Sequence, residues 1–247
     1  MIQHEDDDPI HLMGAWMGDV DLDVRRPYLS EDLPTSLAGY GGLVVMGGAM
    51  GANDDSTSPW LTPVKELIRQ AARNALPTLG ICLGHQLAAV ALGGEVRPNP
   101  AGRQFGLVDV GWERAAQVDG LFSTVATPRR GPHWNDDIVT RLPDGAQLMA
   151  RAPTGEVQAA RHAPTVWGVQ WHPEVDEPLF RGWLTEGNAD PVLAERALEA
   201  LAEAGKELEQ AWRPLAVRFA ELVAQSVAQS VTQSVTQPVT QPADGRA

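Results

Sequence analysis

The only cysteine of this 247-residue chain stands between two glycines, in the segment Gly80-Ile81-Cys82-Leu83-Gly84. A strand-like stretch (residues 78–81) leads into it, and an apolar, helix-like stretch (residues 86–92) leaves it. This order predicts a nucleophile elbow, a sharp strand-to-helix turn that exposes a nucleophile at the carboxyl end of a sheet. Glycines on both sides of the turn would allow the strand and the helix to approach each other closely.

A second segment, Val169-Gln170-Trp171-His172-Pro173-Glu174, supplies the groups that a cysteine nucleophile needs. A free thiol has a pKa of about 8.5, so it needs a base or a positive environment to attack as a thiolate at neutral pH. His172 would take the thiol proton and return it to the leaving group, and Glu174 would orient the imidazole. The strand-like residues 165–170 would bring this pair to the edge of the sheet that carries the elbow.

Acyl transfer also needs hydrogen-bond donors for the oxyanion that develops on the substrate. In an elbow, one donor is the backbone N–H of the residue after the nucleophile, here Leu83. The loop Gly47-Gly48 follows the apolar run 43–46 and is a natural source of the second donor. We therefore predict an oxyanion hole formed by the backbone of Gly48 and Leu83.

Each of these signals is weak alone, because a lone cysteine is usually a buried apolar residue and a Gly-Gly pair is usually a turn. Their combination is more specific. The nucleophile and its base both follow strand-like stretches, and a helix-like stretch follows the cysteine. We therefore favour a catalytic role for Cys82, His172 and Glu174 over a purely structural one.

The elements that must hold these residues alternate between strand and helix at first and then become a series of short strands. This order predicts an α/β fold with an open, mostly parallel sheet flanked by helices and a small antiparallel extension. The expected strands are residues 1–4, 20–25, 43–46, 78–81, 95–97, 105–110, 147–152, 157–161 and 165–170. The expected helices are residues 10–17, 60–74, 86–92, 176–186 and 190–223.

The composition limits the class of partner and the cellular compartment. The chain carries 32 acidic and 19 basic side chains, a net charge of −13, so neither nucleic acid nor an anionic membrane surface is expected as a partner. A single cysteine cannot form an internal disulfide, and the acidic N-terminus does not resemble a signal peptide. Since no apolar run approaches the roughly 18 residues that span a bilayer, we expect a cytoplasmic protein.

Residues 80–86 and 168–174 resemble the signature motifs of class I (triad-type) glutamine amidotransferases, and residues 45–48 resemble the oxyanion loop of that family. The likeness is strongest to stand-alone relatives of the glutaminase domain of GMP synthase, and it extends to about residue 183 of the chain. It implies a flavodoxin-like fold, no cofactor, and hydrolysis of glutamine through a γ-glutamyl thioester on cysteine. The products would be glutamate and ammonia.

The resemblance also implies roles for residues around the three catalytic ones. Gln86 matches a family position that holds the glutamine substrate, and Gln104 and Phe105 belong to a segment whose backbone contacts it. His133 and Asp136 lie in a segment similar to a family loop that borders the active site, where a structural role is an equal alternative. The acidic residues beside His133 are a poor metal-ligand set, so no metal is expected.

The chain departs from the family pattern at three points. Ala49 stands where the oxyanion loop commonly carries proline. The first strand is shorter than in relatives, for which a misplaced start codon is one explanation. The chain also lacks an ATP-binding motif of the form Gly-x-x-x-x-Gly-Lys-Ser/Thr, so ammonia would pass to a separate synthetase, another ammonia-accepting subunit, or solvent.

We predict three parts of the chain and keep three functions open. Residues 1–187 would form the amidotransferase domain, residues 188–223 a helical extension packed on it, and residues 224–247, with their four-residue repeat, a disordered low-complexity tail.

The leading function is a glutamine amidohydrolase. A hydrolase of another γ-glutamyl compound, such as a γ-glutamyl amine or peptide, would use the same triad. A non-catalytic binding or regulatory protein is disfavoured, because its usual sign is loss of a triad residue.

Overall fold

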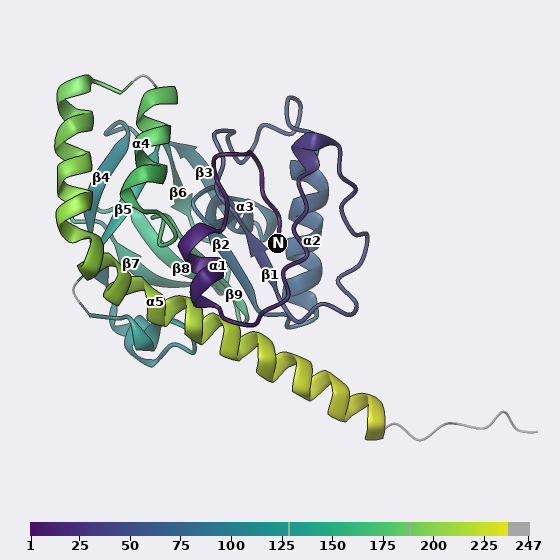
Figure 1. The fold of residues 1–247 in the computed structure, drawn as a ribbon. Coiled ribbons are helices and arrows are strands. Elements are labelled where there is room, and N and C mark those ends of the chain that lie inside the picture. The colour runs from purple at the N-terminus through teal and green to yellow at the C-terminus, as the bar shows by residue number, and fades with distance from the viewer. Residues whose placement is uncertain (128, 188, 237–247) are drawn as a thin grey trace, which may run out of the picture.

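The computed structural model describes residues 1–127, 129–187 and 189–236, and a seven-stranded sheet forms its centre (Figure 1). The strands of this sheet have the order β1-β2-β9-β8-β7-β4-β5. Helices flank the sheet, which confirms the predicted flavodoxin-like α/β class. A separate two-stranded sheet pairs β3 (Glu95–Pro98) with β6 (Asp137–Arg141) in antiparallel orientation.

The parallel part of the sheet positions the predicted catalytic residues. It contains β1 (Leu43–Val45), β2 (Thr78–Ile81) and β9 (Val166–Val169), all of whose residues are buried. Of the expected strands 1–4 and 20–25, only Ile2 and Arg25 pair, through parallel bridges that join Ile2 to Arg25 and to Val45. Because these bridges are parallel, the residues after Ile2 leave the sheet at the same edge as the residues after β1.

The antiparallel part of the sheet is larger than the sequence predicted. It contains β8 (Val157–Ala163), β7 (Gln147–Arg151), β4 (Gln104–Trp112) and β5 (Arg129–Asn135). The strand β5 was not predicted, because Gly131 and Pro132 interrupt its sequence pattern. This strand is at the edge of the sheet, where the missing N–H of a proline is tolerated.

Two helical layers cover the sheet. On one face, α2 (Leu61–Arg73) and α3 (Leu83–Ala91) share an apolar cluster with Leu43 and Val45. On the other face, α1 (His11–Trp16), α4 (Glu177–Glu186) and α5 (Pro191–Thr236) share a cluster with Val44. Successive residues of β1 therefore face opposite layers, as the alternation of side chains along a strand requires.

The helix α5 extends further than predicted. Instead of ending near residue 223, it continues through the first repeats of the tail to Thr236, whereas residues 237–247 lie outside the described part of the chain. The repeat carries no proline before Pro238, and its period of four places Val223 and Val227 against Gly41 and Gly42. No helix in the described part of the chain, α5 included, is long and apolar enough to cross a membrane.

Candidate active site

Cys82 lies at the predicted strand-to-helix turn, between the end of β2 and the first residue of α3. Its φ of 49° is in the left-handed region, which strains the backbone of a residue with a side chain. A Cβ on Gly84 would lie 2.0 Å from the carbonyl oxygen of Val45, and a Cβ on Gly80 would lie 2.4 Å from the carbonyl carbon of Gly84. The two glycines therefore allow α3 to pack against β1 and β2 and fix the position of the thiol.

We expect Gly84→Ala to lower the free energy of unfolding by at least ~3 kcal/mol, because the backbone of β1 must move to admit the methyl group. The matched control is Gly182→Ala in α4, where a Cβ would meet no described atom within 4 Å. Alanine favours a helix over glycine by about 1 kcal/mol, so this control should be at least as stable as the parent protein. Urea unfolding of both variants checks the prediction, and equal stabilities would contradict the close approach at Gly84.

His172 and Glu174 follow the end of β9, the strand next to β2, and therefore reach the same edge of the sheet as Cys82. The Nδ1 atom of His172 lies 2.7 Å from Oε1 of Glu174, and both side chains are buried. Burial, the largest single influence, lowers the pKa of His172, but the charges of Glu174 and Cys82 and hydrogen bonds to both outweigh it. The pKa of His172 is therefore raised well above 6.5.

Two buried glutamines connect the thiol to the opposite side of the site. The Nε2 atom of Gln170 lies 3.6 Å from Sγ of Cys82. The Nε2 atom of Gln86 donates to the carbonyl oxygen of Asp137 at 2.9 Å and to Oε1 of Gln170 at 3.3 Å. A contact between Gln86 and substrate would therefore use its Oε1 atom. Gln170 was given no role in the predicted site, although it lies in the same segment as His172.

A second buried carboxylate, Asp8, lies beside His172 and was missed because the acidic N-terminus was considered only as evidence against a signal peptide. Its Oδ1 atom is 4.0 Å from Nδ1 of His172 and has no hydrogen-bond partner among the described residues, as is also true of Oε2 of Glu174. Gly47 makes room for it, since a Cβ there would lie 2.1 Å from Oδ2 of Asp8. The ligand atoms of Asp8, His172 and Glu174 lie within 4.8 Å of one another, so these three residues could hold a metal ion.

Asp8→Asn is expected to stabilise the protein at neutral and alkaline pH. Burial, followed by the charges of nearby acidic groups, raises the pKa of Asp8 well above 3.8, although the charge of His172 opposes the shift. As the pH rises from 3.8 through the folded-state pKa, ionisation therefore increasingly favours the unfolded chain. Asparagine cannot ionise. The Tm of the variant should therefore equal that of the parent protein near pH 3.8 and exceed it by about 3 °C or more at pH values above the folded-state pKa of Asp8. Thermal unfolding across this pH range checks the prediction, which a pH-independent gain would contradict.

Cys82 and His172 open onto a cavity of about 550 Å³ with an acidic lining. The carboxylates that line it are those of Glu5, Asp7, Asp8, Asp54, Asp136, Asp137 and Glu186. Among the described residues that line the cavity, Arg103 is the arginine. Its Nε and Nη2 atoms lie 2.8 and 2.6 Å from the carboxylate oxygens of Asp136. This guanidinium also lies over the ring of Trp134, 4.3 Å from its centroid. The cavity therefore carries a strong excess of negative charge.

Comparison with known proteins identifies this scaffold. The family model of glutamine amidotransferase class-I matches residues 18–181. The chain belongs to this family. It is 35% identical over 164 residues to a glutamine-hydrolyzing GMP synthase subunit of Archaeoglobus fulgidus, and the match covers 65% of this chain and 81% of that protein. The protein of the same name from Methanocaldococcus jannaschii is 37% identical over 123 residues, which are 49% of this chain and less than two thirds (62%) of that protein.

Solved glutamine amidotransferases share the fold of almost the whole chain. The crystal structure of a glutamine amidotransferase from Thermotoga maritima is similar with a TM-score of 0.78 and 25% identity, covering 89% of this chain and 96% of that one. For the glutamine amidotransferase of Methylobacillus flagellatus the TM-score is 0.79 and the identity 26%, with 90% and 93% covered. The sequence-based recognition of the family is therefore confirmed.

Ala49 gives this amidotransferase a hydrogen bond that the proline common at this loop position could not make. The backbone N–H of Ala49 donates to Oε1 of Glu5 at 2.7 Å. Proline has no N–H, so Glu5 would lose this partner in a loop with the usual family residue. The alanine at this position thus helps to position an acidic side chain at the cavity.

The structure brings together the two loops expected to form the oxyanion hole of this amidotransferase. Leu83 is the first residue of α3, so its N–H lies in the first turn, where helix geometry provides no intrahelical partner. A Cβ on Gly48 would lie 3.1 Å from the side chain of Leu83, and Gly48 lines the cavity. Their role as oxyanion donors stays a prediction.

The side chains of Gln104 and Phe105 contact residues next to the cavity instead of the cavity itself. The Oε1 atom of Gln104 accepts hydrogen bonds from Asn135 at 3.2 Å and Gln158 at 3.1 Å. Phe105 packs edge-on against Trp134, with 5.5 Å between ring centroids. Neither is among the described residues that line the cavity, so the predicted substrate contact, which would use their backbone, stays a prediction.

His133 and Asp136 were expected in a segment bordering the active site, with a structural role as an equal alternative, and the structure places His133 in a strand instead of a loop. His133 lies in β5, because residues 129–135 pair with β4 along their whole length. Its ring nitrogens bond to the carbonyl oxygen of Gly131 and to Gln158, and burial lowers the pKa of His133 to about 4. His133 is thus a neutral structural residue, whereas Asp136, in the turn after β5, does line the cavity.

Proposed function

We propose that this chain is a glutamine amidohydrolase that forms a γ-glutamyl thioester on Cys82 and releases glutamate and ammonia. The observation that carries the proposal is the convergence of Cys82, His172 and Glu174 at one edge of the parallel strands, beside one cavity. The thiol would act as the nucleophile and the imidazole as its base. The buried carboxylate, which is hydrogen-bonded to the imidazole, would orient it. Membership of the class-I glutamine amidotransferase family supports the same reaction.

In this mechanism the sulfur of Cys82 attacks the γ-carbonyl carbon, and the N–H groups of Gly48 and Leu83 stabilise the oxyanion. His172 gives its proton to the leaving nitrogen as the C–N bond breaks. It then takes a proton from the water that attacks the thioester, so glutamate leaves and the Cys82–His172 pair returns to its starting protonation state. Glu174 occupies Nδ1 and thereby leaves Nε2 of His172 for the cysteine and the substrate.

We further propose that the ammonia is used by a separate synthetase subunit. The similar proteins of Archaeoglobus fulgidus and Methanocaldococcus jannaschii are named as subunits of a glutamine-hydrolyzing GMP synthase, which supports a partner that carries the synthetase activity. The acidic composition supports neither a nucleic-acid nor a membrane partner. The cytoplasmic location stays a prediction.

Glutamate release from glutamine, measured with the purified protein alone and mixed with a GMP synthase synthetase subunit, tests the proposal. We expect glutamate formation that requires Cys82 and that increases when the synthetase and its other substrates are present. If the parent protein forms no more glutamate than Cys82→Ala under either condition, the glutaminase proposal is wrong.

A further inference from the structure

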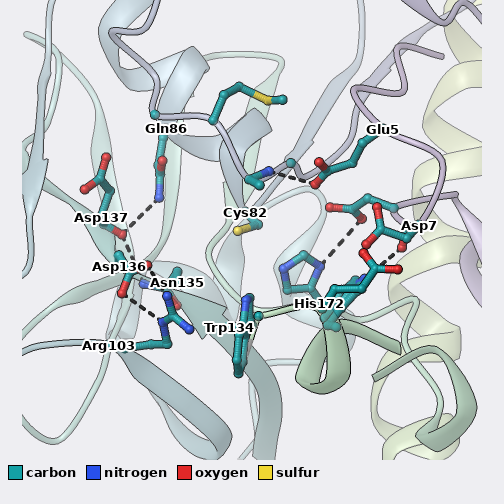
Figure 2. Close-up of a pocket in the computed structure, with 18 of the residues that line it drawn as sticks. Glu5, Asp7, Cys82, Gln86, Arg103, Trp134, Asn135, Asp136, Asp137 and His172 are labelled. Atoms are coloured by element: carbon teal, nitrogen blue, oxygen red, sulfur yellow. Dashed lines mark hydrogen bonds and ion pairs between the residues drawn. The ribbon is translucent and has the colours of Figure 1, made fainter. Parts of the chain in front are cut away.

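One end of the cavity carries three carboxylates that have no Lys or Arg partner among the described residues. Glu5, Asp7 and Glu186 line this end, and Figure 2 shows Glu5 and Asp7 on the side of His172, across Cys82 from Gln86. Glu186 lies beside Asp7. The charge of Asp7 and a hydrogen bond between the two side chains raise the pKa of Glu186. The cavity's described guanidinium, that of Arg103, pairs with Asp136 on the opposite side.

Hydrogen bonds to the loops hold this acidic end in place. The N–H of Ala49 donates to Oε1 of Glu5 at 2.7 Å. The Nε1 atom of Trp183 donates to the carbonyl oxygen of Asp7, also at 2.7 Å, and its ring packs on His172 with 4.5 Å between centroids. These bonds fix the carboxylate of Glu5 and the backbone of Asp7 near the imidazole, whereas Glu186 is exposed to solvent.

Asp8 is an independent sign that this end takes a hydrogen-bond donor. It is 3% exposed and lines the cavity, and its Oδ1 atom has no hydrogen-bond partner among the described residues. The cationic group next to it is His172, whose Nδ1 lies 4.0 Å away and already bonds to Glu174 at 2.7 Å. A buried polar oxygen left without a partner is costly, so a donor that enters the cavity here would be favoured.

The chemistry of acyl transfer assigns this end of the cavity to the leaving group. His172 gives its proton to the leaving nitrogen, so a substituent on that nitrogen extends past His172, while the γ-glutamyl group occupies the side of Gln86. The leaving nitrogen of glutamine carries only hydrogens. Glutamine would therefore make no use of the acidic end of a cavity of about 550 Å³.

We propose that the cavity accepts γ-glutamyl amides whose amine part carries a second positive charge, such as γ-glutamyl conjugates of an alkyl diamine. This substrate class rests on the proposed thioester chemistry. The γ-carbon–nitrogen bond breaks as the thioester forms, the proton of His172 passes to the amine nitrogen, and water hydrolyses the thioester to glutamate. The distal ammonium of the diamine lies among Glu5, Asp7 and Glu186, which attract it and accept its hydrogen bonds.

Three γ-glutamyl amides that differ only in the end of the alkyl chain test the proposal: the butylamide, the aminobutylamide and the carboxypropylamide. Glutamate release gives kcat/KM for each, with glutamine as a fourth substrate. We expect the cationic aminobutylamide to exceed the neutral butylamide by about tenfold, as several partly exposed ion pairs together would give. The anionic amide should be the poorest substrate, and added salt should reduce the differences.

Variants of the acidic end provide a second test, in which the measured quantity is the ratio of kcat/KM for the cationic and the neutral amide. The double variant Asp7→Asn/Glu186→Gln should lower this ratio to about one. Ala49→Pro, which removes the donor that holds Glu5, should lower it partially. The matched control Glu199→Gln/Glu203→Gln removes the same net charge from exposed positions of α5 and should keep the parent ratio.

The outcomes separate this proposal from the proposed function. Equal rates for the three amides, or a preference for glutamine over the aminobutylamide by more than about tenfold, would overturn the cationic substrate class and leave a Cys82-dependent hydrolase intact. No Cys82-dependent glutamate from any of the four substrates would instead overturn the hydrolase itself.

Discussion

Replacement of His172 by alanine is expected to lower glutamate release from glutamine by about 10⁴-fold, because both formation and hydrolysis of the thioester lose their proton carrier. His172 is buried, and the two carboxylates beside it, those of Glu174 and Asp8, both approach its Nδ1 atom. Steady-state kinetics check the loss. His11→Ala, at an exposed position of α1, is the control and should stay within about twofold of the parent.

The same variant should make the thioester visible. A γ-glutamyl nitroanilide has a leaving group that needs little protonation, so acylation of the variant should suffer less than hydrolysis of the thioester. A γ-glutamyl group should then accumulate on the protein and be detected by mass spectrometry. Cys82 is the single cysteine of the chain, so a thioester reports on this residue alone. Parental rates in His172→Ala would remove His172 from the mechanism.

The parts of the site that neighbouring residues form could be predicted from the sequence. The parts that depend on contacts between residues far apart in the chain could not. The elbow around Cys82 was predictable because two glycines, a strand and a helix follow one another within a few residues. Asp8 was not predictable in this way. It reaches His172 because Ile2 pairs in parallel with β1 and because Gly47 leaves space for its carboxylate, and neither contact has a signature in residues 5–8.

Two errors in the fold have equally specific physical causes. The edge strand β5 contains Gly131 and Pro132, which normally end a strand, yet it pairs with β4 in full register, and this moved His133 from the expected loop into the sheet. The helix α5 outlasts its expected end because Val223 and Val227 pack over Gly41 and Gly42, so tertiary contact stabilises a segment of weak local preference.

The other large effect is expected from Glu174→Gln, which should lower kcat/KM for glutamine by about 10³-fold or more while the fold is retained. An amide keeps the shape of the carboxylate but cannot stabilise the imidazolium of His172. Among the groups that raise the pKa of His172, the charge of Glu174 is the largest, and it opposes the burial that lowers that pKa. The variant's imidazole should therefore lose its proton at lower pH, and the alkaline limb of the pH–rate profile should move to lower pH.

Asp8→Asn is the informative comparison, because it changes the other carboxylate that faces His172. The pKa of Asp8 is raised well above 3.8, which favours its neutral form, so replacement by asparagine removes little charge from the site. We therefore expect a loss of activity no larger than about tenfold, without a comparable shift of the alkaline limb. If the two variants lost activity equally and shifted the limb equally, the imidazolium would be stabilised by Asp8 and Glu174 together. The triad would then be a tetrad in which the N-terminal acidic run supplies a member.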